Sequence, residues 1–182
     1  MGFYGEGLSM LSSNALTFYS LSDDPDLKNI IYIKGKNNRY LLGTAKGYYY
    51  FDITTGKKEQ FTDLAGKTGS GDISCYYTDD NGVWFGTKGN GLYFRSNDGI
   101  AKLFLRSGNS GEDYIRNINS DGKNLWLSTL SGVIVIDISS RKAIRKLTTV
   151  PDENSADRLP HNSIIMTYIR RDGSVLPATE MD

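Results

Sequence analysis

Apolar and polar positions alternate in short runs along most of the chain, and turns that contain Gly, Asn or Asp separate these runs. Period-2 alternation over four to eight residues predicts half-buried β-strands. One run spans 73–78, and the turn Asp79-Asp80-Asn81-Gly82 joins it to a second run at 83–87. Asn-Gly is a strong hairpin signal. Two further runs, at 91–95 and 100–104, complete a predicted unit of four antiparallel strands.

The same unit recurs along the chain. Its second strand carries a phrase that ends in a small residue and threonine, and the copies are Tyr40–Thr44, Val83–Thr87, Leu125–Thr129 and Val175–Thr179. The threonines that end these copies are 43, 42 and 50 residues apart. A period in the forties that is built of short strands is typical of a β-propeller. We therefore predict an all-β fold of propeller blades, each of four antiparallel strands.

Alignment of the repeats divides the chain into three whole blades with a half-blade at each end. The predicted boundaries are 1–20 for the first half-blade, 27–62, 71–105 and 113–148 for the blades, and 162–182 for the last half-blade. The two halves could share one sheet and close a ring, or the chain could be a piece of a longer protein. We favour the second alternative, that the chain is a piece of a longer protein. Its open strand edges would then invite pairing, and we expect a homodimer through blade edges.

Several repeat positions are assigned to packing. Trp84 and Trp126 are equivalent, and we expect both in the core between blades rather than on a ligand platform. Small residues let neighbouring sheets approach, and threonine suits a pleated strand. The remaining positions with this structural role are Thr44, Gly86, Thr87, Thr129 and Thr179. The last copy has Leu176 for tryptophan and Pro177 inside the strand, which predicts a sheet margin or an irregular strand.

Composition excludes several classes of protein. The chain has 182 residues, and its 21 basic and 21 acidic residues give a formal net charge of zero, which argues against a nucleic-acid partner. The single Cys75 excludes an internal disulfide and a cysteine zinc cluster. No apolar run reaches 18 residues and no signal-peptide pattern opens the chain, so we expect neither a membrane segment nor a signal peptide here.

The sequence offers little catalytic chemistry. It has no nucleophile elbow, phosphate-binding loop or metal-spaced histidine pair, so we predict no catalytic residue, no metal site and no cofactor. Binding sites in propellers usually lie around the central channel, in the loops that enter the innermost strands. On this geometry the ligand-binding candidates are Asn29, Asp72, Asp113, Tyr114, His161 and Asn162. The longest connection, 148–162, is interpreted as a surface insertion, with a functional loop as the alternative.

Two stretches carry a family resemblance. They are Leu159-Pro160-His161-Asn162-Ser163-Ile164 with Asp172-Gly173, and Asp79–Thr87 with Gly91-Leu92. Both resemble the two-component-regulator propeller repeat, which reads roughly Leu-Pro-x-Asn-x-Ile, a strand, Asp-x-x-Gly, Leu-Trp-Ile-Gly-Thr and Gly-Leu. The resemblance covers nearly the whole chain. Departures at Leu41, Ser128 and Leu176–Ala178 weaken the transfer of a specific ligand.

The resemblance implies a place and a role. The family is similar to the extracytoplasmic sensor region of bacterial hybrid two-component systems, especially in Bacteroides-like bacteria, where propellers precede a further β domain, a membrane helix and a histidine kinase. It implies a non-catalytic, periplasmic sensor segment of a membrane-anchored parent, with an oligosaccharide as ligand and the rest of the propeller and the downstream sensor domain as partners. The alternative is a protein-interaction scaffold of a secreted or surface assembly. A propeller lyase or hydrolase is less favoured, because no acid and base converge.

Overall fold

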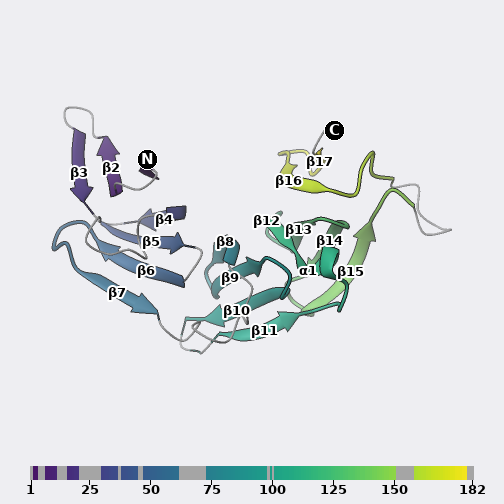
Figure 1. Cartoon of the computed structure of the whole chain (residues 1–182), viewed down its shortest axis with the longest axis horizontal. Helices are drawn as coiled ribbons and strands as arrows, with labels where there is room; N and C mark the ends of the chain where they lie inside the picture. Colours follow the sequence, from purple (N-terminus) through teal and green to yellow (C-terminus); the bar gives the residue numbers. More distant parts are fainter. Residues whose placement is uncertain are drawn as a thin grey trace. The chain divides into compact units, whose positions relative to one another are not determined.

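The computed structural model describes residues 2–3, 7–11, 16–20, 30–36, 38–44, 47–61, 73–97, 99, 101–150 and 158–179. The chain divides into two compact units, Met1–Ala65 and Gly66–Asp182, which are described separately. Both units consist of antiparallel sheets whose strands follow one another in chain order (Figure 1).

The first unit contains two sheets. One has the order β1-β2-β3, with β1 at Gly2–Phe3, β2 at Gly7–Leu11 and β3 at Leu16–Ser20. Blade 1 has the order β4-β5-β6-β7, with β4 at Ile30–Lys36, β5 at Arg39–Thr44, β6 at Gly47–Asp52 and β7 at Lys58–Phe61. The two strands predicted for the first half-blade are β2 and β3, and β1 adds a short strand that the sequence pattern did not reveal.

The second unit contains two four-stranded sheets and a hairpin. Blade 2 is formed by β8 (Ile73–Asp79), β9 (Gly82–Thr87), β10 (Leu92–Ser96) and β11 (Lys102–Leu105). Blade 3 is formed by β12 (Ile115–Ser120), β13 (Asn124–Thr129), β14 (Gly132–Asp137) and β15 (Lys142–Leu147). The terminal hairpin is β16 (Ile164–Ile169) with β17 (Val175–Thr179). The predicted fold of four-stranded propeller blades is confirmed.

An aspartate and a tryptophan together fix the first turn of blades 2 and 3. Asp79 Oδ1 accepts hydrogen bonds from the backbone N–H groups of Asn81 and Gly82, at 2.8 and 3.1 Å, and its Oδ2 accepts from Trp84 Nε1 at 2.9 Å. Asp121 does the same in blade 3, where its Oδ2 lies 2.9 Å from Trp126 Nε1. Each aspartate therefore closes its turn and also gives the indole N–H of the tryptophan an acceptor.

The repeated threonine closes the loop between the second and third strands. Thr87 Oγ1 donates to the carbonyl of Gly91 at 2.8 Å and accepts from the N–H of Asn90 at 2.9 Å. Thr129 Oγ1 donates to the carbonyl of Gly132 at 2.8 Å, and Thr44 Oγ1 makes the equivalent bond in blade 1. These threonines are buried, so their hydroxyl groups supply polar partners to loop backbone that water does not reach.

Each sheet of the second unit packs on the sheet before it. Trp84 lies in a core with residues of blades 2 and 3, namely Leu92, Ile115, Ile118, Leu125, Leu127, Ile134 and Ile136. Trp126, on the opposite face of blade 3, packs against a second core of Val133, Val135, Leu159 and Ile164. We call the blade 2–blade 3 interface the first joint, and the interface of blade 3 with the terminal hairpin the second joint.

Candidate functional site

The loops that enter the innermost strands carry the predicted ligand-binding residues. Two such loops are described, at 106–114 before β12 and at 158–163 before β16. Asn29 and Asp72, which belong to the equivalent loops before β4 and β8, lie outside the described residues. The candidate site is therefore assessed on Asp113, Tyr114, His161 and Asn162.

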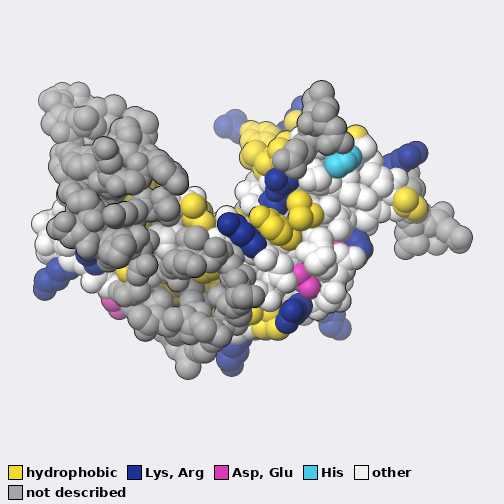
Figure 2. Space-filling model, viewed as in Figure 1, with side chains coloured by type: hydrophobic (Ala, Val, Ile, Leu, Met, Phe, Trp, Pro, Cys, Tyr) yellow, Lys and Arg dark blue, Asp and Glu magenta, His cyan; other side chains and the backbone are white. Residues whose placement is uncertain are grey.

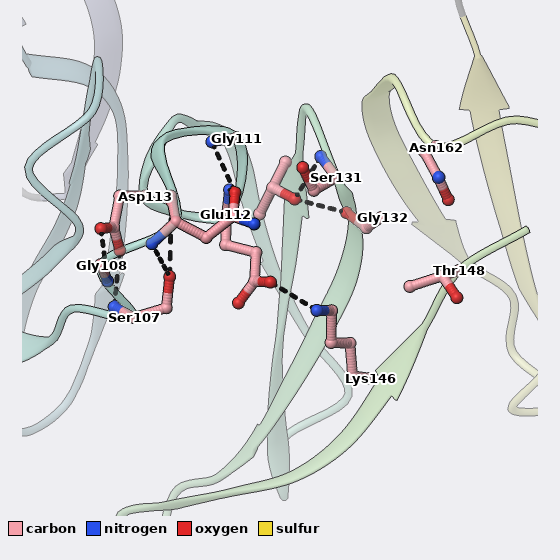
Figure 3. Close-up of polar contacts among 12 residues, drawn as sticks. Ser107, Gly108, Gly111, Glu112, Asp113, Ser131, Gly132, Lys146, Thr148 and Asn162 are labelled. Carbon is pink, nitrogen blue, oxygen red and sulfur yellow. Dashed lines mark hydrogen bonds and ion pairs between the residues drawn. The ribbon is translucent and has the colours of Figure 1, made fainter. Parts of the chain in front are cut away.

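Asp113 is held mainly by backbone groups, and Arg106 Nε lies 3.9 Å from its Oδ2. It ends α1 (Ser110–Asp113), a single turn that Asn109 caps by accepting from the N–H groups of Gly111 and Glu112. The Asp113 carboxylate accepts from Ser107 N at 2.7 Å and Gly108 N at 3.0 Å (Figure 3). Its carbonyl oxygen accepts from Gly89 N and Gly91 N at 3.1 and 3.0 Å, in the loop between β9 and β10. The residue is 4% exposed, so it braces the two loops instead of facing a ligand.

Asn162 has the corresponding role at the second joint. It lies two residues before Ile164, as Asp113 lies two residues before Ile115. Its carbonyl accepts from Gly132 N at 2.7 Å, and its Oδ1 accepts from Thr149 N at 2.8 Å. The same contact therefore occurs at both described joints. The residue two positions before the innermost strand accepts a hydrogen bond from a glycine N–H of the preceding blade, and this glycine lies at or just before the start of that blade's third strand.

Tyr114 and His161 are the more accessible candidates. Tyr114 is half-buried and forms an isolated antiparallel bridge with Lys88. His161 is exposed, its Nδ1 accepts from Ser163 N at 3.0 Å, and Figure 2 shows the histidine at the surface. Ser163 in turn accepts from Arg116 Nη1 at 3.1 Å, which links β12 to the same loop. The structure thus leaves His161 as the candidate whose side chain is most available to a ligand.

An ion pair lies beside the α1 loop. Glu112, next to Asp113, accepts from Lys146 Nζ on β15 (Figure 3). Lys146 also lines a groove with apolar residues of β11, β14 and β15, which include Leu105, Ile134 and Ile144. The sequence patterns did not reveal this pair, because α1 has only four residues and its one turn has no hydrophobic period.

Catalytic chemistry is not apparent in the described part of the chain. Within it, no group of three or more His, Cys, Asp or Glu side chains is placed to hold a metal ion. Cys75 is partly buried, and its removal from water raises the pKa of its thiol to about 12, so the thiolate needed for nucleophilic attack is scarce near neutral pH. No helix among the described residues is long and apolar enough to cross a membrane.

A separate charged pocket lies in the first unit. It is lined by Arg39, Tyr50, Asp52, Thr55, Lys57, Lys58 and Glu59. The Arg39 guanidinium is 4.3 Å from the centre of the Tyr50 ring and 3.1 Å from Glu59 Oε2. Hydrogen bonds from the backbone of Thr55 and Thr54 hold the pKa of Asp52 below its usual value. The charges in this pocket are largely matched to each other, and none of the predicted ligand-binding residues that the structure describes lines it.

Solved structures with a similar strand arrangement include two bacterial extracellular domains and a WD40 domain. Over 98% of its length, the chain matches 23% of the extracellular domain of the putative hybrid two component system BT3049 from B. thetaiotaomicron, with a TM-score of 0.70 and 20% identity. For the extracellular domain of the putative one component system BT4673 from the same organism, the values are 96% and 24% coverage, TM-score 0.71 and 21% identity. The Neurospora crassa Pan2 WD40 domain matches with TM-score 0.55 and 15% identity, over 86% of this chain and 46% of that one.

No protein-family model matches the sequence, and no curated protein matches it. The chain spans less than a quarter of the length of the two B. thetaiotaomicron structures. At identities of 15 to 21%, the likeness establishes a shared architecture. The chain therefore has the β-propeller blade fold of these domains.

Proposed function

We propose that this chain is a non-catalytic sensor segment in the extracytoplasmic part of a bacterial two-component signalling protein, and that it responds to an oligosaccharide. The observation that carries the proposal is the match of nearly the whole chain to the extracellular domain of a putative hybrid two component system at a TM-score of 0.70, and to that of a putative one component system at 0.71. The repeat phrases around Leu159–Ile164 and Asp79–Thr87, which resemble the two-component-regulator propeller repeat, support it independently.

The arrangement of the loops suits binding more than chemistry. In the described loops before β12 and β16, backbone N–H groups donate hydrogen bonds to the side chains of Asp113 and Asn162. These bonds hold the loops in place, so they form a preorganised rim. A ligand at this rim would favour one packing of adjacent blades over another, and a signalling equilibrium shifts by the difference in affinity between the two states. The rest of the propeller and a downstream sensor domain are the proposed partners, and the periplasm is the proposed compartment.

A binding experiment tests the proposal. The purified chain is titrated with a panel of defined oligosaccharides by calorimetry, and we expect saturable binding of one class. His161→Ala should then weaken binding at least tenfold, because the imidazole is exposed on the loop before β16. Arg171→Ala is the matched control, since Arg171 lies in the turn after β16, at the other end of the same strand, and should bind as the wild type does.

Further outcomes separate the candidate functions. Chromatography of the oligosaccharides after long incubation should show no cleavage products. If cleavage products appear, the chain is a lyase or hydrolase and not a sensor. The protein-interaction scaffold is the second candidate, favoured by the exposed apolar side chains of the terminal hairpin, Ile165, Met166, Tyr168 and Leu176. Absence of binding across the panel, together with unchanged signalling when the gene segment for these blades is deleted, would reject the sensor in favour of the scaffold.

A further inference from the structure

The two joints of the second unit are built from the same repeat positions but differ in polarity. Strand register identifies the equivalent residues. Cys75 lies opposite Gly86 in blade 2, and Asn117 lies opposite Ser128 in blade 3. On the sheet that packs against each of these faces, the corresponding residues are Ile118 at the first joint and Thr167 at the second.

The first joint is close and apolar. A Cβ atom added to Gly86 would lie 2.7 Å from Cys75 Sγ and 2.7 Å from Ile115 Cβ, so the sheets meet at the glycine backbone. Ile118 is 5% exposed and belongs to the apolar core of this joint. The first joint therefore has no room for a bound polar molecule at these positions.

The second joint carries three buried oxygen atoms at these same positions. They are Asn117 Oδ1, Ser128 Oγ and Thr167 Oγ1, and none of them has a hydrogen-bond partner among the described residues. Ser128 and Thr167 are 0% exposed. Buried hydroxyl and amide oxygens almost always have a partner, either protein or ordered water, because burial without one costs free energy. Three such oxygens in one interface therefore point to a shared partner.

The strand pairing places the three residues at the same joint. Asn117 and Ser128 are cross-strand neighbours, so their side chains lie on one face of blade 3. Asn119, two residues along the same face, donates from Nδ2 to the carbonyl of Thr167 at 3.0 Å, which brings β16 beside β12 at this point. Val133, which lies opposite Ser128, also lines a cavity together with Thr167.

The cavity has the size for water. Its volume is about 180 Å³, and its remaining lining residues are Leu147, Arg158, Leu159, Val175 and Pro177. Of the three residues with buried oxygens, Thr167 lines the cavity, and Ser128 adjoins it through its cross-strand neighbour Val133. A buried water needs roughly 10–15 Å³ for its centre and two to four polar partners. Two hydroxyl groups, which donate or accept, and one amide oxygen, which accepts, match the two donors and two acceptors of a water molecule.

We propose that the second joint binds ordered water through Asn117 Oδ1, Ser128 Oγ and Thr167 Oγ1. The hydrated joint then replaces the direct apolar contact of the first joint. Water-mediated hydrogen bonds join the blade 3 face to the terminal hairpin, and this site is distinct from the loops before β12 and β16.

The sign of a stability change tests the proposal. Thr167→Val keeps the shape of the side chain and removes its hydroxyl. If the hydroxyl binds water, the thermal midpoint falls, and the loss is non-additive with that of Ser128→Ala because both side chains share the partner. If the hydroxyl has no partner, the same substitution raises the midpoint. Thr167→Ser, which keeps the hydroxyl, controls for the change at this position.

A direct count of bound water gives the second measurement. Oxygen-17 magnetic relaxation dispersion counts long-lived internal waters in the wild type and in the triple variant Asn117→Cys, Ser128→Gly, Thr167→Ile, which carries the residues of the first joint. We expect the variant to lose at least one such water. If the triple variant does not fold, Thr167→Val provides the same comparison. A raised midpoint for Thr167→Val or an unchanged water count overturns the proposal.

Discussion

Gly86 sets how closely blade 3 approaches blade 2. Its position is the small residue of the repeated phrase, and the space for a side chain there is already filled by Cys75 and Ile115. We expect Gly86→Ala to lower the free energy of unfolding by about 1–3 kcal/mol, the usual cost of overpacking a core. Urea unfolding monitored by tryptophan fluorescence measures the change.

A double mutant shows whether the clash is the cause. Ile115→Ala removes Cγ2, one of the two Ile115 atoms that the new Cβ would meet at 2.7 Å, so Gly86→Ala should cost less in that background than in the wild type. Equal costs in the two backgrounds would show that Gly86 matters through the backbone and not through its contact with blade 3.

Asp121 links the stability of blade 3 to pH. Burial acts to raise the pKa of Asp121, but hydrogen bonds from Trp126, Asn124 and Lys123 outweigh it and lower the pKa from 3.8 to about 2. Because the pKa is lowered on folding, the stabilisation is present above about pH 4 and is lost as pH falls toward 2. Asp121→Asn should therefore reduce the loss of stability over this interval, as measured by urea unfolding at several pH values.

The comparison isolates Asp121 from the other acidic groups. The pKa values of Asp52, Asp137 and Asp172 are also lowered, by hydrogen bonds to neighbouring backbone or side-chain groups, and these contributions are common to both proteins. Asp80→Asn is the surface control. Asp80 accepts the hydrogen bond from Asn97 through its backbone carbonyl oxygen, which the substitution leaves in place. An identical acid slope in wild type and Asp121→Asn would contradict the prediction.

The loop between β13 and β14 depends on one buried hydroxyl. Thr129 Oγ1 donates to Gly132 O and accepts from Ser131 N at 3.0 Å. Thr129→Val keeps the shape and leaves both loop groups without this partner, so we expect a loss of about 1–3 kcal/mol in the free energy of unfolding. Thr54→Val, at an exposed turn position, is the control and should change stability little. A neutral Thr129→Val would mean that water replaces the hydroxyl.

The elements that the sequence predicts well are those with a local pattern. Alternation, Asn-Gly and Asp-Gly turns and the repeated phrase locate the strands of the whole blades, because register and turn chemistry are encoded within a few residues. The short α1 escaped prediction, since its Asn109 cap resembles any loop asparagine. The role of Asp113 also escaped it, because its partners Gly89 and Gly91 belong to the preceding blade. Contacts between blades depend on packing that no single repeat specifies.

The sequence locates the loops that carry the candidate residues, and the ligand-binding role of these residues stays a prediction. The repeat alignment located the loops before β12 and β16, but only the structure shows that Asp113 and Asn162 are engaged by backbone while His161 is exposed. Asn29 and Asp72 stay predictions, since they lie outside the described residues.

Burial of equivalent residues changes from blade to blade across the second unit. Trp84, covered by blade 3, is 2% exposed, whereas Trp126 is partly buried at the second joint, and Leu176 at the same repeat position is 43% exposed. Tyr168 lies opposite Leu176 on this face and is 59% exposed. The outer face of the terminal hairpin is thus apolar, like a face that packs in a joint. Among the described residues, no sheet covers it.

We expect this face to drive self-association of the chain. Large apolar groups on one face favour a partner surface that removes them from water. Light scattering over a range of concentrations should show a mass that rises toward a dimer, and Tyr168→Lys with Leu176→Lys should keep the chain monomeric. Ile144→Lys, at a 57% exposed position on β15, is the matched control and should leave association unchanged. A monomer at all concentrations would show that the hairpin face is stable in water, and association that survives the double substitution would instead place the contact at the strand edges.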